Sequence, residues 1–511
     1  MSAPDTKSST TSNLGRDFIS SLVVFLVALP LCMGIAVASG MSPQSGLITG
    51  IIGGIVVGSL AGSPLQVSGP AAGLAVLVFE IVREQGVATL GIIVVLAGAL
   101  QILAGAARVG HWFRSISPAI VHGMLAGIGL LIVASQLHVL LDRTPLPNGL
   151  SNLAAVPGAF VDMSPTSAGQ TEWAFALGAI TIIAFLGWEK FRPKALKLVP
   201  GALIGVVVST AIAVALRPDV KRVIVPPSLL DGVKMPVLAD FTAALSNPEI
   251  IISAIVIAFI ASAETLLSAA AVDRMHDGPR TKYNKELFSQ GVGNMLCGFL
   301  GGLPMTGVIV RSSANVQAGA ATRLSTMLHG TWILGFVMLL PWLLREMPTA
   351  ALAGVLVVTG WRLVKVSHAT HLFNQYGALP AAIWAVTFVM VVVTDLLTGV
   401  LVGLALSALE ILPHIRNLKL NVEQKVENDV SEIELTGAAT FVNLPKLANK
   451  LDELPDGGRI RLNLGKLAYL DHTCAEMITD WVSRKAKRGT KVEYDLGGNA
   501  RYGQILGAHA H

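Results

Sequence analysis

Long apolar segments recur along this chain of 511 residues, from about Asp17 to about Leu412, and no other feature limits its fold as strongly. Charged residues make up only 14% of the sequence and hydrophobic residues 53%, whereas a soluble protein carries about a quarter charged residues. A segment that crosses a bilayer must satisfy its backbone hydrogen bonds internally, and a run of about 20 apolar residues does so as a helix. The sequence therefore predicts a polytopic α-helical membrane protein in a lipid bilayer.

Two of the apolar segments are interrupted by glycine and proline at corresponding places in the two halves of the chain, residues 63–73 and 301–315. A helix that begins in the middle of a membrane has such a sequence, because its free N–H groups and the positive end of its dipole then face a cavity. A pair of interrupted segments indicates the substrate site of a transporter, and helix N-termini bind anions. We therefore expect an anion transporter whose substrate contacts Ser68, Gly69, Ala71, Ala72, Gly307, Val308, Ile309 and Arg311.

Two charged residues are expected at membrane depth. Glu264 lies inside the apolar segment 254–268, where an ionisable group costs about 3 kcal/mol to insert and therefore usually has a function. Ser268 follows one turn later on the same helix face, and we assign proton or cation coupling to Glu264 and Ser268. The alternative for Glu264 is a structural hydrogen bond to a neighbouring helix. Two roles are considered for Arg311. It either adds positive potential for an anion or forms an ion pair with Glu264 that holds two helices together.

Lysine and arginine gather in alternate short loops, for example at 190–197 and 280–285. This alternation follows the positive-inside rule and places these loops in the cytoplasm. About fourteen transmembrane segments are expected when each interrupted segment is counted once. An even number of segments leaves both termini in the cytoplasm. We expect the protein to reside in the inner (cytoplasmic) membrane of the cell. No basic stretch is interleaved with aromatic residues on a soluble face, so no nucleic acid partner is expected.

The sequence contains no recognisable motif of spaced residues that would carry enzyme chemistry. The three cysteines lie far apart, so neither a disulfide framework nor a metal cluster is expected. There is no Walker loop, no His-Glu-x-x-His motif and no Cys-x-x-Cys pair. We therefore expect no enzyme and no cofactor.

Composition divides the chain into three parts. Residues 1–15 are polar and are expected to form a loose cytoplasmic tail, and residues 16–415 form a transport domain with a polar loop at 142–171. Residues 416–511 show strand and helix periodicity and predict a small cytoplasmic α/β domain. The elements expected in it are strands at 430–435, 459–464 and 491–494 and helices at 444–454 and 474–487.

A series of short stretches resembles the sulfate permease (SulP) family, which includes bacterial relatives of the solute carrier 26 family. These stretches are residues 27–30, 38–40, 46–47, 67–70, 201–204, 301–304, 350–356 and 394–400. Residues 416–511 resemble the STAS domain that usually ends such proteins. The resemblance implies a seven-plus-seven inverted repeat with two half-helices, and an anion held between them near Glu264. It also implies an elevator-type alternating-access movement, with a core domain (about 16–107 and 249–345) moving against a gate domain (about 108–217 and 346–415).

Several readings of the transport activity stay open. The main hypothesis is secondary active transport of a small anion, inorganic or a short dicarboxylate such as fumarate, coupled to a proton. Some bicarbonate-transporting relatives look sodium-coupled, with an aspartate near this place; Glu264 followed by Ser268 favours a proton. Sodium-coupled bicarbonate transport and an uncoupled anion channel are the alternatives. Val308 and Ile309 stand where some relatives carry small or hydroxyl residues, which leaves sulfate and bicarbonate undecided.

Two further expectations concern assembly and regulation. We expect the chain to form a homodimer. In STAS domains that are phosphorylated, a serine follows an aspartate before a helix. Here His472 follows Asp471, so phosphorylation at this place is not expected.

Overall fold

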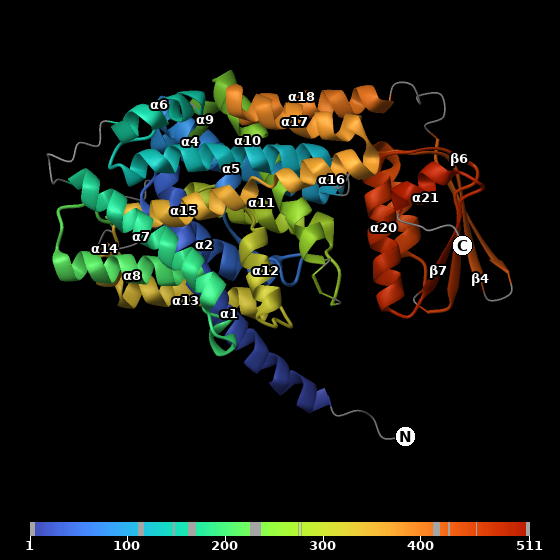
Figure 1. Ribbon diagram of the computed structural model, residues 1–511, viewed down its shortest axis with the longest axis horizontal. Coiled ribbons are helices and arrows are strands. Elements are labelled where there is room, and N and C mark those ends of the chain that lie inside the picture. Colours follow the sequence, from blue (N-terminus) through green and yellow to red (C-terminus); the bar gives the residue numbers. More distant parts are fainter. Residues whose placement is uncertain are drawn as a thin grey trace. The chain divides into compact units, whose positions relative to one another are not determined.

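The structure is a computed structural model that describes residues 6–110, 117–146, 149–161, 170–224, 237–273, 275–276, 278–411, 419–427, 430–455 and 457–506. The described residues form two compact units, one within residues 1–110 and 128–364 and the other within residues 111–127 and 365–511. Figure 1 colours and labels their elements along the chain.

Apolar helices make up most of the residues up to 411. Seven described helices are long and apolar enough to cross a membrane, namely Asn13–Ala38, Pro43–Leu60, Ala72–Ala106, Pro118–Leu140, Glu172–Phe191, Pro248–Asp273 and Thr349–Tyr376. Five shorter apolar helices are Gly149–Val161, Gly201–Leu216, Leu324–Leu339, Ala378–Val393 and Leu396–Glu410. The predicted polytopic helical fold agrees with these helices, while the number of fourteen segments stays a prediction.

The first unit consists of helices and one two-stranded ribbon. Its elements are α1 (Thr6–Ala38), α2 (Pro43–Ile52), α3 (Gly58–Leu60), β1 (Ser68–Pro70), α4 (Ala75–Ala106), α6 (Gly149–Val161), α7 (Gln170–Phe191), α8 (Gly201–Leu216), α9 (Leu238–Leu245), α10 (Pro248–Asp273), α11 (Tyr283–Phe299), β2 (Met305–Gly307), α12 (Ile309–Gln317), α13 (Leu324–Leu339), α14 (Pro341–Arg345) and α15 (Thr349–Leu363). Helix α5 (Pro118–Leu140) contributes to both units. Within α4, Gly86 has a φ of 85°, so the residues before and after it form two helices joined by a kink.

Helix α2 and the turn that follows it pack closely on their neighbours through glycines spaced four residues apart, at Gly46, Gly50, Gly54 and Gly58. A methyl group on Gly46 would overlap the carbonyl of Cys32 in α1, and one on Gly54 would lie 2.6 Å from the Cα of Gly330 in α13. Small residues allow helix backbones in a membrane to approach this closely. The same row of glycines therefore fixes α2 between α1 and α13.

The predicted polar loop at 142–171 is wrong in part, because Gly149–Val161 forms α6. Its residue Asn152 ties the helix to the preceding segment: the Asn152 side chain accepts from the N–H of Leu146 at 2.8 Å and donates to the carbonyl of Leu146 at 2.9 Å. The Asn152 carbonyl also lies 3.1 Å from Nε2 of His138 in α5. Polar residues on either side of this apolar stretch concealed the helix in the sequence.

The second unit ends in an α/β domain. Its elements are α16 (Val366–Tyr376), α17 (Ala378–Val393), α18 (Leu396–Ile411), β3 (Asn421–Glu427), β4 (Val430–Ala439), α19 (Leu444–Asp452), β5 (Arg459–Asn463), β6 (Leu467–Leu470), α20 (His472–Lys487), β7 (Lys491–Asp495) and α21 (Ala500–Leu506). The strand order is β3-β4-β5-β7, with β6 also paired to β4, and only β3 runs antiparallel to its neighbour. The strands and helices predicted from periodicity match β4, β5, β7, α19 and α20.

The start of α20 is where other parts of the second unit meet the α/β domain. His472 is 4% exposed; its Nε2 lies 2.7 Å from Oγ of Ser117, just before α5, and its Nδ1 lies 3.7 Å from Oε1 of Glu410 in α18. The Tyr469 hydroxyl donates to the same Glu410 oxygen at 3.1 Å. Burial opposes protonation of His472, but the carboxylates of Glu410, Asp471 and Glu476 outweigh burial and raise the pKa of His472.

We expect the thermal midpoint of the purified protein to decrease as the pH is raised from about 6 to about 8. In the variant His472→Gln the decrease should be smaller. Because the folded-state pKa of His472 is raised, its contribution to stability is complete below the unfolded pKa and is lost as pH rises through the folded pKa. The difference between the two proteins separates His472 from all other titrating groups. Melting curves with the same pH slope in both proteins would contradict this account.

Candidate functional site

Strands β1 and β2 bring the two interrupted segments together in one short ribbon. They pair antiparallel, with Ser68 opposite Gly307, Gly69 opposite Thr306 and Pro70 opposite Met305. Each strand leads directly into a helix. After β1, Ala71 precedes a 3-10 turn (Ala72–Leu74) that opens α4, and after β2, Val308 precedes α12. The half-helices expected from the glycine and proline pattern are therefore present and adjacent.

The antiparallel pairing sets how the two helix starts are arranged. Since β1 and β2 run in opposite directions, they lead to their helices, α4 and α12, from opposite ends of a three-residue ribbon about 7 Å long. The first N–H groups of each helix have no partner inside it. These are the groups of Ala72 and Gly73 in one half-helix and of Ile309 and Val310 in the other. Two positive dipole ends thus lie at the two ends of one short ribbon.

Three side chains from two other helices hold the ribbon in place. Thr265 of α10 accepts from the N–H of Gly307 at 3.1 Å, and Asn294 of α11 bonds both the N–H and the carbonyl of Met305 at 2.7 and 3.2 Å. Gln290 of α11 donates to Oγ of Ser68 at 2.5 Å. We did not predict these residues from the sequence, although each is a polar side chain within an apolar helix, which is the signal that would have found them.

Glu264 lies beside the first half-helix. A methyl group on Gly73, in the first turn, would lie 2.9 Å from Oε2 of Glu264. This carboxylate oxygen is buried and has no hydrogen-bond partner among the described residues, so the alternative of a structural hydrogen bond to a neighbouring helix finds no support at this atom. Ser268 lies one turn further along α10 and is buried.

Arg311 is fully buried, with 0% of its surface exposed. Its guanidinium lies against Gly69 of β1, where a methyl group would overlap Nη1, and the buried side chains of Cys32 and His329 lie within its electrostatic range. The guanidinium lies beside the Cys32 thiol, and none of its three side-chain nitrogens is paired with an oxygen acceptor among the described residues. The alternative of an ion pair between Arg311 and Glu264 is therefore wrong, and neither charge has an ionic partner among the described residues.

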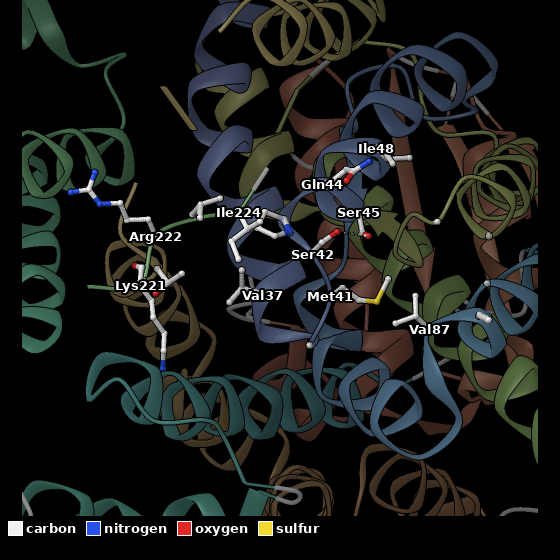
Figure 2. A pocket seen from close by; sticks show the side chains of 18 residues that line it. Val37, Met41, Ser42, Gln44, Ser45, Ile48, Val87, Lys221, Arg222 and Ile224 are labelled. Carbon is white, nitrogen blue, oxygen red and sulfur yellow. Dashed lines mark hydrogen bonds between the residues drawn. The ribbon is translucent and has the colours of Figure 1, made fainter. Parts of the chain in front are cut away.

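A cavity of about 1040 Å³ lies where the α1–α2 corner meets the end of α11 and the segment 221–224. Figure 2 shows Ser42, Gln44 and Ser45 as the polar side chains of this corner, with the guanidinium of Arg222 directed away from them. Arg222 pairs instead with Glu346. Gly301, which begins the segment leading into β2, also lines the cavity, so the cavity reaches the chain that carries the second half-helix.

The described residues hold no cluster of three or more histidine, cysteine, aspartate or glutamate side chains arranged to bind a metal ion. The ribbon region offers backbone donors, the buried guanidinium of Arg311 and the partly buried carboxylate of Glu264.

Comparison with known proteins identifies the family. The model of the sulfate permease family matches residues 14–387. The YvdB protein of Bacillus subtilis (strain 168) is 29% identical over 491 residues, covering 93% of this chain and 89% of that protein. The bicarbonate transporter BicA of Picosynechococcus sp. is 27% identical over 445 residues, covering 83% of this chain and 75% of its own.

A solved structure shows the same fold. The murine Solute Carrier 26 family member A9 anion transporter in the inward-facing state aligns with a TM-score of 0.64 at 15% identity, covering 99% of this chain and 91% of its own. The matching family is one of permeases and the sequence relatives bear transporter names, in agreement with the prediction that the chain is not an enzyme. Since the family model spans well over half of the sequence, the chain belongs to the sulfate permease family.

Proposed function

We propose that this membrane transporter moves a small anion, inorganic or a short dicarboxylate such as fumarate, together with a proton. The observation that carries the proposal is the pairing of two half-helix starts by β1 and β2, flanked by Arg311 and Glu264, which have no ionic partner among the described residues. In this proposal the site residues are Ser68, Gly69, Ala71, Ala72, Gly307, Val308, Ile309 and Arg311, with Glu264 and Ser268 for coupling.

The anion binds in our proposal through backbone N–H groups at the two helix starts. Such donors, together with the dipole ends, favour negative charge without needing a basic residue in direct contact. The unpaired guanidinium of Arg311 adds positive potential from behind β1. A buried cation without a partner is costly, and a bound anion offsets this cost.

Coupling is assigned to Glu264. Its unpartnered Oε2 takes a proton while the carboxylate lies against Gly73 in the first turn of the half-helix. When Glu264 is ionised, its negative charge opposes an anion at the same helix start; when it is protonated, this repulsion disappears. Proton and anion therefore bind together more readily than either alone.

Movement and placement in the membrane complete the proposal. A core domain (about 16–107 and 249–345) moves against a gate domain (about 108–217 and 346–415) in an elevator-type step, and the cavity at the α1–α2 corner serves as a vestibule from outside. The α/β domain acts as a cytoplasmic STAS domain, both termini are cytoplasmic, the membrane is the inner membrane, and the protein functions as a homodimer.

Uptake by reconstituted proteoliposomes tests this function. The purified chain is given a panel of labelled anions (sulfate, bicarbonate, nitrate, phosphate and fumarate) under imposed pH or sodium gradients. We expect accumulation that follows the pH gradient and ignores sodium. Accumulation that requires sodium would replace the proton by sodium, and uptake that never exceeds equilibrium would indicate an uncoupled channel.

Arg311 offers a graded test of the binding proposal. We expect Arg311→Ala to weaken anion binding about tenfold or more, and Arg311→Lys to weaken it less, because lysine keeps the charge and loses the planar fork. Anion-dependent shifts of the thermal midpoint measure both affinities and report folding in the same experiment. Equal affinity in Arg311→Ala and the wild type would remove Arg311 from the site.

A further inference from the structure

Gln66, which comes two residues before β1, lies at the start of the second half-helix. It is 3% exposed, and its carboxamide occupies the place that a side chain on Gly307 would take. Its Nε2 donates to the carbonyl of Thr265 in α10 at 3.0 Å. Because Thr265 offers a carbonyl oxygen, only the nitrogen end of the carboxamide can face it, and this contact fixes which end is which.

The other end of the same carboxamide has no partner. Oε1 of Gln66 is buried and makes no hydrogen bond with the described residues. A carbonyl oxygen can only accept, and a buried acceptor left without a donor is unfavourable. A ligand that brings its own O–H group to this oxygen would satisfy it.

Two kinds of group at the proposed anion site act in the opposite sense. Backbone N–H groups and the Arg311 guanidinium only donate, so they stabilise any anion alike. The hydroxyl of Thr306 is also buried without a partner, but it can rotate to donate or accept. An acceptor that cannot rotate away discriminates, because it repels an anion oxygen without hydrogen and binds one that carries hydrogen.

We propose that Gln66 is a specificity-determining residue, whose Oε1 selects oxyanions that carry one hydrogen over oxyanions of the same shape that carry none. The inference rests on the proposed anion site and narrows its substrate class. The shared chemistry is a monoprotonated oxyanion, either trigonal like bicarbonate or tetrahedral like hydrogen phosphate. A site built to bond a substrate hydroxyl rejects the analogue that lacks it, because the buried polar group is then left unpaired.

Matched anion pairs test the proposal on the full-length protein in proteoliposomes at mildly alkaline pH. Bicarbonate and nitrate are both planar trigonal monoanions, and hydrogen phosphate and sulfate are both tetrahedral dianions, so each pair differs mainly by one O–H group. We expect one hydrogen-bearing member to bind about tenfold or more tightly than its partner. The pair that shows the larger ratio identifies the trigonal or the tetrahedral class. Equal affinities within both pairs overturn the proposal but leave the anion site intact, whereas no binding of any anion would overturn the site itself.

Substitutions test whether Gln66 causes the ratio of affinities between the hydrogen-bearing and the hydrogen-free anion. In Gln66→Met, which keeps length and loses the acceptor, the ratio should fall to about one while the hydrogen-free anion binds at least as well as before. Gln66→Glu keeps an acceptor, so the ratio should persist at lower overall affinity. Gln136→Met, a buried glutamine in α5, is the matched control and should keep the wild-type ratio. Oε1 of Gln290 and Oδ1 of Asn315 are further unpartnered acceptors among the described residues: a ratio lost in Gln290→Met or in Asn315→Ala and kept in Gln66→Met would overturn the assignment.

Discussion

Replacing Glu264 with glutamine should abolish anion accumulation driven by a pH gradient and leave anion binding intact. Glutamine has nearly the same shape and fills the space beside Gly73, but it does not exchange a proton. A pH difference of about one unit supports about tenfold accumulation when one proton moves with each anion, and the variant should reach only the level found without a gradient. Uptake into proteoliposomes with and without the gradient measures this, and binding is followed by anion-dependent thermal shifts.

Glu249→Gln is the matched control for this result. Glu249 lies in the first turn of the same helix, α10, and is exposed, so its loss should leave the pH-driven accumulation unchanged. Accumulation by Glu264→Gln that still follows the pH gradient would show that another group carries the proton.

Replacing Gly307 with leucine should abolish anion binding. Any side chain at this position takes the space of the Gln66 carboxamide and adds bulk directly before the N-terminus of α12. Because the donors of the proposed site are backbone groups, bulk acts here more strongly than a change of charge. Ala71→Leu, at the start of the other half-helix, should have the same effect. We expect affinity to fall at least about a hundredfold in each variant.

A leucine placed elsewhere controls for bulk alone. Gly335 of α13 has no atom within 4 Å of the place where its Cβ would lie, so Gly335→Leu should bind anion normally. Size-exclusion chromatography and thermal unfolding establish that the variants fold. Near-normal affinity in both Gly307→Leu and Ala71→Leu would place the anion elsewhere.

Much of the fold was predictable from local patterns in the sequence. Glycine and proline interrupt a helix whatever surrounds it. The glycines and prolines at 63–73 and 301–315 therefore made both half-helices predictable from the sequence. Alternation of apolar residues likewise predicted β4, β5 and β7. Both signals lie within a few residues of the structure that they specify.

The polar framework of the site was not predictable in this way. Gln66 and Thr265, which fix one another, are 199 residues apart, and nothing in either local sequence indicates the partner. The absence of an ion pair between Arg311 and Glu264 depends on which side of the ribbon each one lies, a property of the packed helices rather than of either segment. The prediction missed helix α6 for a different reason, because the apolar face of α6 is short and flanked by polar residues.

The ribbon of β1 and β2 has a consequence for how the protein is made. Val67, at the beginning of the ribbon, donates its N–H to Oγ of Ser312, a residue 245 positions later in the chain. At about 5–20 residues per second during synthesis, the first half-helix waits roughly 10–50 s for its partner. During that time its backbone groups have no strand to bond, in a lipid that offers none either. These backbone groups therefore gain their strand partner only once the second half of the chain has been made.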